Sequence, residues 1–310
     1  MYQFKIGAID VIKISESLSP AVEPFTFLDG LPPDAIERNL SWLRPVLYDG
    51  RERKLILSGH AWLLRTPRQV ILLEACAGNH KPRPGFPRGH MLNTRWLERL
   101  AEAGVQPKDV DVILCTHLHV DHVGWFTTRE NESWVPTFPE ARYLVDALEY
   151  DNWNPKTRTL PPFPLNENVF EDSIAPVMGA GLMTLVTPPY EVEPGVRIVP
   201  ARGHTLGHVA VKVENGNDSA LFVGDAMHTP LQIIHPECPT YGCEDKAAAI
   251  DTHRRLLAEC ADQRRLFVPT HFPEPYSAVR ILRTDDGFAF TTIDGEMPQG
   301  LRETLNTRRR

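Results

Sequence analysis

Short apolar segments recur along the chain, and segments with helical periodicity separate many of them. Several apolar segments are nearly continuous, which is typical of strands that are buried on both faces of a sheet. The pattern therefore predicts strands alternating with helices, as in α/β proteins. Residues 1–15 are expected to form one alternating strand. The other predicted strands are 55–64, 70–73, 110–115, 141–145, 196–199, 208–213, 221–223, 266–268, 279–282 and 288–293.

Two helices are predicted between these strands. The first is expected to be capped by Asn93 or Thr94 and to end at Gly104, because polar caps and a terminal glycine satisfy the free backbone groups of helix ends. The second covers 246–260, where apolar residues at helical spacing form one face. Near the end of the chain, the Asp-Asp-Gly run at 285–287 predicts a hairpin turn.

Two segments, about 20–50 and 150–181, do not fit the alternation and are interpreted as insertions in one domain that covers 1–310. The first carries a short predicted helix that begins at Asp34, with Glu37 placed for a capping box. The second begins with a proline-rich stretch. Such long connections serve as lids or binding loops, or are plain surface excursions, and both interpretations stay open.

A His-x-His-x-Asp-His motif, residues 117–122, directly follows a buried predicted strand. Residues two apart at an extended strand end face the same way, so His117 and His119 can reach one metal ion. Asp121 and His122 lie past a bend and can point to a second ion. A solvated turn that binds nothing is disfavoured, because apolar residues alternate with these polar ones.

Three further residues with metal-binding side chains each follow a predicted apolar strand. They are His204, Asp225 and His271. Strand ends along one edge of a sheet are where open α/β architectures gather their chemistry. These three side chains are therefore candidates to complete the site.

The His-x-His-x-Asp-His motif, Gly203-His204-Thr205-x-Gly207-His208, Gly224-Asp225 and the late His271 resemble the motifs of the metallo-β-lactamase superfamily. The resemblance extends over about residues 55–275 and implies an αββα sandwich, two mixed β-sheets packed face to face with helices on the outer faces. The run Thr-His-Leu-His-x-Asp-His-x-Gly-Trp is most similar to the branch of lactonases and methyl-parathion-type hydrolases. The resemblance to the family also implies a homodimer.

The same resemblance implies a role for each ligand. One ion would be held by His117, His119 and His204, and the other by Asp121, His122 and His271, with Asp225 bridging both. Glu74 stands where the family usually has a supporting aspartate, so a carboxylate remains but is one methylene longer. His208 is interpreted as a supporting residue and not as a ligand.

Nitrogen and carboxylate donors without a thiolate suit two divalent ions such as zinc, and also accept manganese, iron or cobalt. Two such ions can lower the pKa of a shared water to about 7, so that a metal-bound hydroxide attacks the substrate. The predicted function is a dinuclear metal-dependent hydrolase that cleaves a small ester or lactone. Asp121 is expected to orient the nucleophile and accept its proton, and His228 to give a proton to the leaving group.

Other reactions on the same ions stay open, namely hydrolysis of a phosphoester, a phosphotriester or a thioester. An iron-dependent oxidoreductase and a non-catalytic binding protein of the same fold are further alternatives, which the complete ligand set disfavours. No Gly-x-Ser-x-Gly motif and no glycine-rich phosphate loop with lysine occur, so serine acyl transfer, nucleotide hydrolysis by such a loop and an organic cofactor site are not expected.

Aromatic and apolar residues near the motifs are candidates for the substrate pocket. Four are adjacent to ligands in the sequence: Trp125, Phe126, Met227 and His228. Five others lie on the two insertions and could form an aromatic lid: Phe25, Phe27, Trp42, Tyr150 and Trp153. Ordinary packing explains each of them equally well.

Composition narrows the partners to a small-molecule substrate. The net charge of −7 disfavours nucleic acid, which is bound through clustered Lys and Arg. Neither a leader peptide nor a membrane span is recognisable, so a cytoplasmic location is predicted. The five cysteines are odd in number and scattered, which indicates reduced thiols, and Cys238 and Cys243 lack the second pair that a structural zinc site needs. The basic tail 308–310 is interpreted as a solvated chain end.

Overall fold

The chain divides into two compact units. The computed structural model describes residues 1–158 and 163–307. Unit 1 comprises Met1–Ser17, Gly59–Pro200 and Leu206–Val209, and unit 2 comprises Leu18–Ser58, Ala201–Thr205 and Ala210–Arg310. Strands β2 (Ile9–Val22) and β4 (Lys54–Arg65) each have residues in both units.

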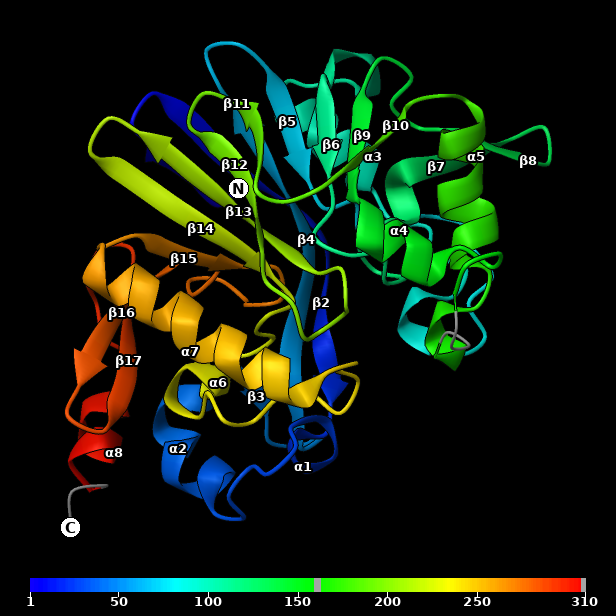
Figure 1. Cartoon of the computed structure of the whole chain (residues 1–310). Coiled ribbons are helices and arrows are strands. Elements are labelled where there is room, and N and C mark those ends of the chain that lie inside the picture. Colours follow the sequence, from blue (N-terminus) through cyan, green and yellow to red (C-terminus); the bar gives the residue numbers. More distant parts are fainter. Residues whose placement is uncertain (159–162, 308–310) are drawn as a thin grey trace. The chain divides into compact units, whose positions relative to one another are not determined.

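A mixed sheet forms the centre of unit 1, with the strand order β1-β2-β4-β5-β6-β9-β10 (Figure 1). The pairs β1/β2 and β4/β5 are antiparallel, whereas β5/β6, β6/β9 and β9/β10 are parallel. The carboxyl ends of β5, β6 and β9 therefore lie at the same edge, where the loops that follow them begin. The remaining strands of this sheet are β1 (Gln3–Ile6), β5 (Val70–Leu73), β6 (Val112–Leu114), β9 (Arg142–Asp146) and β10 (Met183–Val186).

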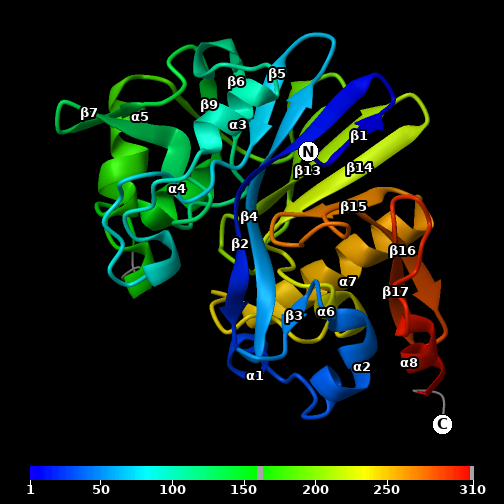
Figure 2. The same cartoon turned by 180° about the vertical axis from the view of Figure 1, so that it is seen from behind.

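Helix α3 (Trp96–Glu102) covers part of this sheet, as Figure 2 shows from behind. Its apolar face buries Trp96 and Leu100 in one hydrophobic core with Leu72 of β5 and Ile113 of β6. Burial of each large apolar side chain contributes roughly 1.5–3 kcal/mol to stability. This core fixes the strands from whose ends the 117–122 motif and Glu74 emerge.

The sequence pattern missed one hairpin of unit 1 and the first strand of another, whose second strand it predicted at 196–199. The two hairpins are β7/β8 (Thr127–Glu130 and Ser133–Pro136) and β11/β12 (Tyr190–Glu193 and Val196–Pro200), both antiparallel. The strands β7 and β8 are short and partly exposed, so they lack the apolar alternation that signals a strand.

The insertion at 150–181 is anchored in unit 1 by buried charges. Asp172 accepts two hydrogen bonds of 2.6 Å from Arg83, and Lys81 Nζ lies 3.3 Å from Asp172 Oδ1 and 2.8 Å from Thr127 Oγ1. Burial lowers the pKa of Lys81 to about 8, although the charge of Asp172 opposes this shift. The helical pieces here are α4 (Ala147–Trp153), η4 (Pro164–Asn166), the π-helix η5 (Phe170–Ile174) and α5 (Ala175–Gly179). Residues 159–162 of the predicted proline-rich stretch lie outside the described residues.

Unit 2 contains a second mixed run of strands in the order β13-β14-β15-β16-β17. All neighbouring pairs are antiparallel except β14/β15, which is parallel. Two-residue β3 (Tyr48–Asp49) pairs with the start of β4. The strands are β13 (Val209–Asn215), β14 (Asp218–Gly224), β15 (Leu266–Pro269), β16 (Val279–Thr284) and β17 (Gly287–Thr292).

Helix α7 (Lys246–Asp262) lies along β14, β15 and β16 (Figure 1). Asp245 caps it by accepting a hydrogen bond of 2.9 Å from Ala248 N, and its buried face includes His253, Leu257 and Cys260. The predicted helix and its apolar face are thus confirmed. The other helices of unit 2 are α1 (Pro24–Phe27), α2 (Ala35–Leu43), α6 (Leu231–Ile234) and α8 (Leu301–Thr307).

The prediction of a single strand over 1–15 is wrong. Gly7 adopts a positive φ of 56° and turns the chain, so that Ile6 pairs with Ile9 and two antiparallel strands form. Glycine tolerates this conformation without steric cost. The predicted hairpin near the end of the chain is confirmed by β16 and β17, in which Thr284 pairs with Gly287.

Two predicted helix caps are also wrong, because other partners compete for the capping groups. Thr94 N donates to Asn79 Oδ1 (2.8 Å), Asn79 Nδ2 donates to Thr94 O (2.9 Å), and α3 begins two residues later. Asp34 stands at the N-cap of α2 but makes no side-chain cap bond. It pairs instead with Arg38 at 2.6 Å.

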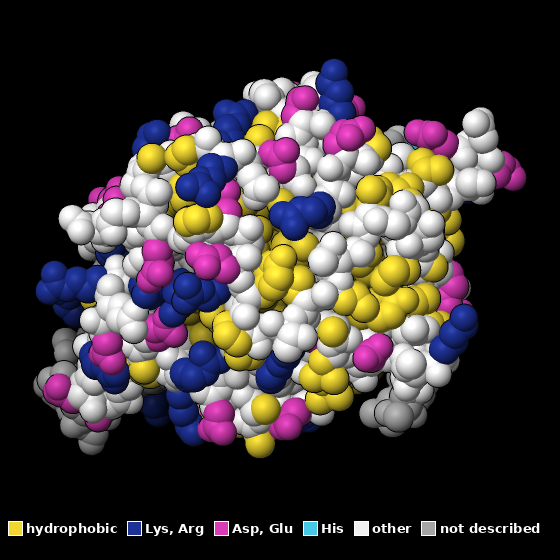
Figure 3. Space-filling model, turned by 45° about the horizontal axis from the view of Figure 1, so that its top comes forward, with side chains coloured by type: hydrophobic (Ala, Val, Ile, Leu, Met, Phe, Trp, Pro, Cys, Tyr) yellow, Lys and Arg dark blue, Asp and Glu magenta, His cyan; other side chains and the backbone are white. Residues whose placement is uncertain are grey.

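Lys and Arg side chains are interspersed with Asp and Glu on the face of the molecule drawn in Figure 3. Among residues 1–158 and 163–307, no helix is both long and apolar enough to cross a membrane. The predicted basic tail, 308–310, lies outside the described residues.

Candidate metal centre

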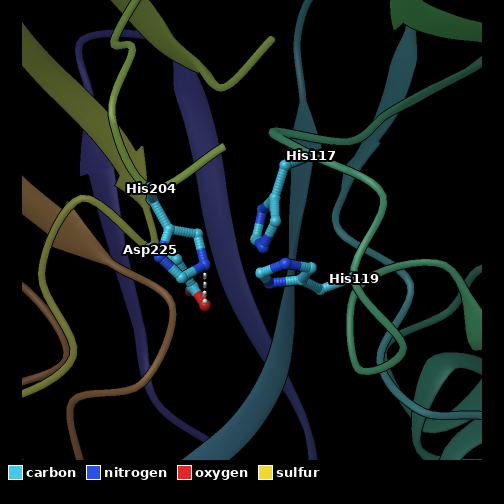
Figure 4. A group of neighbouring side chains, drawn as sticks. All are labelled: His117, His119, His204 and Asp225. Atoms are coloured by element: carbon cyan, nitrogen blue, oxygen red, sulfur yellow. Dashed lines mark ion pairs between the residues drawn. The ribbon is translucent and has the colours of Figure 1, made fainter. Parts of the chain in front are cut away.

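The predicted ligands of unit 1 lie together in the loop after β6, and we name His117, His119, Asp121 and His122 half-site 1. His117 and His122 are buried, and the ring centroid of His117 lies 4.4 Å from that of His119 and 4.1 Å from that of His122. Figure 4 shows the imidazoles of His117 and His119 near each other. The carboxylate of Asp121 is 26% exposed and lies 3.8 Å from His122 Nε2.

Glu74 fixes the orientation of half-site 1 from the end of β5. Its Oε2 lies 3.0 Å from His122 Nδ1, and its Oε1 accepts a hydrogen bond of 2.6 Å from Thr116 Oγ1. Glu74 is 2% exposed and has a positive φ of 67°. The longer carboxylate therefore performs the supporting contact that was expected of the family's aspartate.

The predicted ligands of unit 2 also lie together, and we name His204, Asp225 and His271 half-site 2. Asp225 follows β14 and His271 follows β15, and because these neighbouring strands are parallel, their carboxyl ends meet. His271 Nε2 lies 3.1 Å from Asp225 Oδ1, and His204 Nε2 lies 3.6 Å from Asp225 Oδ2 (Figure 4).

His228 lies against half-site 2. Its Nε2 is 2.9 Å from Asp225 Oδ2, and its ring stacks on His271 at a centroid distance of 5.3 Å. Donor atoms of Asp225, His228 and His271 lie within 4.8 Å of one another. The predicted proton donor thus contacts the residue that was expected to bridge the two ions.

The donor chemistry of both half-sites fits divalent metal ions. Imidazole binds a metal through the ring nitrogen that carries no proton, and the other nitrogen donates a hydrogen bond. His122 Nδ1 faces Glu74, and His271 Nδ1 lies 3.0 Å from the carbonyl oxygen of Ser58. Both contacts are to hydrogen-bond acceptors and therefore favour a proton on Nδ1, which makes Nε2 the ring nitrogen that would bind a cation.

Three expected pocket residues are packed in the core instead. Trp125 stacks on Trp96 at 5.3 Å between centroids, Phe126 contacts Tyr143 at 5.0 Å, and Met227 is fully buried. Adjacency to ligands in the sequence was a poor guide, because successive side chains of an extended or turning segment point in different directions.

Two of the five expected lid residues pack on other aromatic residues. Trp42 is 3% exposed and packs on Phe290 at 5.7 Å between centroids. Tyr150 packs on Phe170 at 5.8 Å, and Phe25 is 42% exposed. The prediction of a lid is wrong for Trp42, which belongs to the core of unit 2.

The remaining two aromatic residues each contact one of the candidate site residues. The ring of Phe27 lies 5.2 Å from that of His228 within unit 2. The ring of Trp153 lies 5.6 Å from that of His119 within unit 1. Both side chains are nevertheless buried, Phe27 at 9% and Trp153 at 6% exposure, so an aromatic lid stays a prediction for them.

Sequence reasoning missed several residues that hold the half-sites. Ser58 contacts His271 through its backbone, Cys243 Sγ lies 3.8 Å from His204 Nδ1, and Asn166 Oδ1 accepts a hydrogen bond of 3.0 Å from Val120 N. Glu149 also belongs to this group. None of them carries a local motif, so no pattern in the sequence could have identified them.

A further group of metal-binding residue types, His235, Glu237 and Cys238, lies within unit 2. Burial and the neighbouring charges of Glu237 and Asp29 raise the pKa of Cys238 to about 12. The thiol is therefore protonated at neutral pH, and this disfavours metal binding. Cys243 is not part of the group.

A family model described as the metallo-beta-lactamase superfamily matches residues 56–271, more than half of the chain. The chain belongs to this superfamily. The matched segment contains all seven predicted ligands, and the two mixed β-sheets with helices confirm the predicted fold class of this metallo-β-lactamase protein.

The curated relatives of this metallo-β-lactamase-fold chain include distant lactonases. An N-acyl homoserine lactonase of a Bacillus species is 27% identical over 163 residues, which are 52% of this chain and 56% of that protein. The N-acyl homoserine lactonase of Bacillus thuringiensis is 24% identical over 188 residues, 60% of this chain and 66% of that protein. The chain thus matches less than two thirds of the length of either relative.

Solved structures support the same fold. The hydrolase AbOPH of the β-lactamase superfamily shares 24% identity and a TM-score of 0.78, over 94% of this chain and 97% of that one. AidC, a dizinc quorum-quenching lactonase in complex with a product, shares 18% identity and a TM-score of 0.73, over 94% and 96%. At these identities the likeness establishes the fold.

Proposed function

We propose that this chain is a dinuclear metallohydrolase in which half-sites 1 and 2 together hold two divalent cations, preferably zinc, and that its substrate is a small lactone or ester. In this proposal the two units form the single domain that the sequence predicts. His117, His119 and His204 would hold one cation and Asp121, His122 and His271 the other, with Asp225 shared.

One observation carries the proposal. Nδ1 of His122 and Nδ1 of His271 each face a hydrogen-bond acceptor, Glu74 and the Ser58 carbonyl respectively, and these contacts orient both rings so that Nε2 would be the metal-binding nitrogen. A largely buried set of imidazoles and carboxylates without a thiolate suits zinc and accepts manganese, iron or cobalt. Membership of the superfamily supports the same assignment.

Two bound cations would lower the pKa of a shared water and polarise the carbonyl oxygen of the substrate. Asp121 can hold that water and accept its proton, because its carboxylate is partly exposed beside His122. His228 can give a proton to the leaving oxygen. Its Nε2 contacts Asp225, whereas its Nδ1 has no hydrogen-bond partner among the described residues.

A lactone or ester is favoured because the named relatives are N-acyl homoserine lactonases and one structural neighbour is a dizinc lactonase. A panel of lactones, aryl esters, thioesters, phosphodiesters and phosphotriesters would separate the substrate classes on zinc-reconstituted protein. One iron per chain together with oxygen consumption would instead favour the oxidoreductase alternative.

The ligand assignment is tested by His119→Ala and Asp225→Ala. We expect each variant to lose at least one metal equivalent, measured by mass spectrometry, and nearly all hydrolysis. Matched controls are His80→Ala, an exposed histidine of unit 1, and Asp218→Ala, at the opposite end of β14 from Asp225. Full metal content and full activity in either ligand variant would overturn the proposal.

A further inference from the structure

Glu149 is a buried carboxylate to which the sequence analysis gave no role. It is the third residue of α4 and only 1% exposed. Its Oε1 accepts hydrogen bonds of 2.9 Å from Leu118 N and from Trp153 Nε1, and its Oε2 accepts one of 3.0 Å from Gly207 N. All these contacts lie within unit 1.

The two backbone groups that Glu149 binds belong to the two segments that carry the histidine motifs. Leu118 stands between the candidate ligands His117 and His119, and Gly207 stands three residues after His204. A direct backbone bond of 2.9 Å, from Val209 N to the carbonyl oxygen of residue 116, joins the same two segments. The Glu149 carboxylate and this backbone bond together hold the two segments beside each other.

The close packing of Gly207 on α4 is a second, independent observation. A Cβ atom at Gly207 would lie 2.3 Å from the N, Cα and Cβ atoms of Glu149. Real side chains do not approach backbone this closely, so any other residue would push the segment away from α4. The glycine of the His-Thr-x-Gly-His motif thus permits the contact with Glu149.

The third donor links Glu149 to the surroundings of a ligand. Trp153 donates through Nε1 to Glu149, and the ring of Trp153 lies 5.6 Å from the ring of His119. The Glu149 carboxylate consequently holds two neighbours of His119. One is the backbone of Leu118, and the other is the indole of Trp153, which packs on the His119 imidazole.

We propose that Glu149 is a positioning residue of the metal centre, which holds the segments around Leu118 and Gly207 in the spacing that metal binding requires. This role rests on the proposed function. A buried carboxylate that accepts three hydrogen bonds cannot be replaced by an amide, because Gln offers one oxygen and turns an N–H group toward at least one of the three donors. Loss of such supporting contacts typically weakens metal binding about 10- to 100-fold.

The test uses Glu149→Gln on the full chain, with Asp146→Ala as the matched control. Asp146 caps the same helix by accepting a hydrogen bond of 3.0 Å from Glu149 N, so its loss weakens α4 while the Glu149 carboxylate remains. We expect zinc affinity, measured by chelator competition, to fall about 10- to 100-fold in Glu149→Gln and less than about 3-fold in the control. The visible spectrum of the cobalt-loaded protein should change in Glu149→Gln alone.

Gly207→Ala provides a second variant that leaves the carboxylate intact, and it should reproduce the loss of affinity and the spectral change. If wild-type protein bound neither zinc nor cobalt, the proposed function would fail and this role with it. If wild-type protein bound both metals, and Glu149→Gln and Gly207→Ala matched its affinity and spectrum, the positioning role alone would be overturned.

Discussion

Glu74→Gln tests how far one supporting carboxylate determines metal binding. The substitution keeps the shape of a side chain that is 2% exposed, removes its charge and replaces one acceptor oxygen by an amino group. The affected contacts are those to His122 Nδ1 (3.0 Å) and Thr116 Oγ1 (2.6 Å). The Thr116 hydroxyl can rotate and accept a bond from the amide, whereas His122 Nδ1–H still needs the one remaining oxygen.

The magnitude follows from the change at His122. A hydrogen bond to a charged acceptor contributes about 1.5–3 kcal/mol and a neutral one about 0.5–1.5 kcal/mol, so the exchange costs about 1–2 kcal/mol. Thr116 N, 3.3 Å from Oε1, keeps at best a weak partner. Because about 1.4 kcal/mol corresponds to a factor of ten, zinc affinity should fall about 10-fold or somewhat more.

Chelator competition gives the zinc affinity, and urea unfolding of the metal-free protein separates the loss of metal binding from a general loss of stability. Glu74→Asp is the matched control, since it retains the charge with one methylene less and should bind zinc more tightly than Glu74→Gln. Zinc affinity in Glu74→Gln equal to that of the wild-type chain would refute the reasoning that Glu74 orients His122.

Two further predictions concern pH, and in both the unfolded chain binds more protons than the folded one, so stability rises with pH. Burial lowers the pKa of Lys81 from 10.5 to about 8. Between pH 8 and 10.5 the free energy of unfolding of the wild-type chain should therefore rise by about 3 kcal/mol more than that of Lys81→Met, and urea unfolding measures both. Equal rises in both proteins would contradict this. Burial likewise lowers the pKa of His253 from 6.5 to about 4, so stability should fall as the pH drops from 6.5 to 4, more steeply than in His253→Gln. Parallel acid unfolding curves of the wild-type chain and His253→Gln would argue against this role of His253.

The sequence by itself determined those features of the candidate site that depend on residues close together in the chain. The His-x-His-x-Asp-His run places its side chains within one loop, and Asp225 and His271 were candidates because each follows an apolar strand. The fold decided that these two strands are parallel neighbours, so that the two side chains meet. Apolar runs also identified most buried strands, because a strand covered on both faces must be apolar throughout. Glu74 was recognised through the resemblance to the superfamily, and its contact with His122 Nδ1 agrees with a supporting role.

Only the tertiary structure decided the supporting contacts. Glu149 meets Leu118 across 31 positions of sequence and Gly207 across 58, and His271 meets the carbonyl oxygen of Ser58 across 213. Trp125 packs on Trp96 in the core, although it stands beside the ligands in the sequence. Periodicity tells whether a side chain faces a core, but the partner it finds there depends on how distant segments pack, and this information is spread over the whole chain.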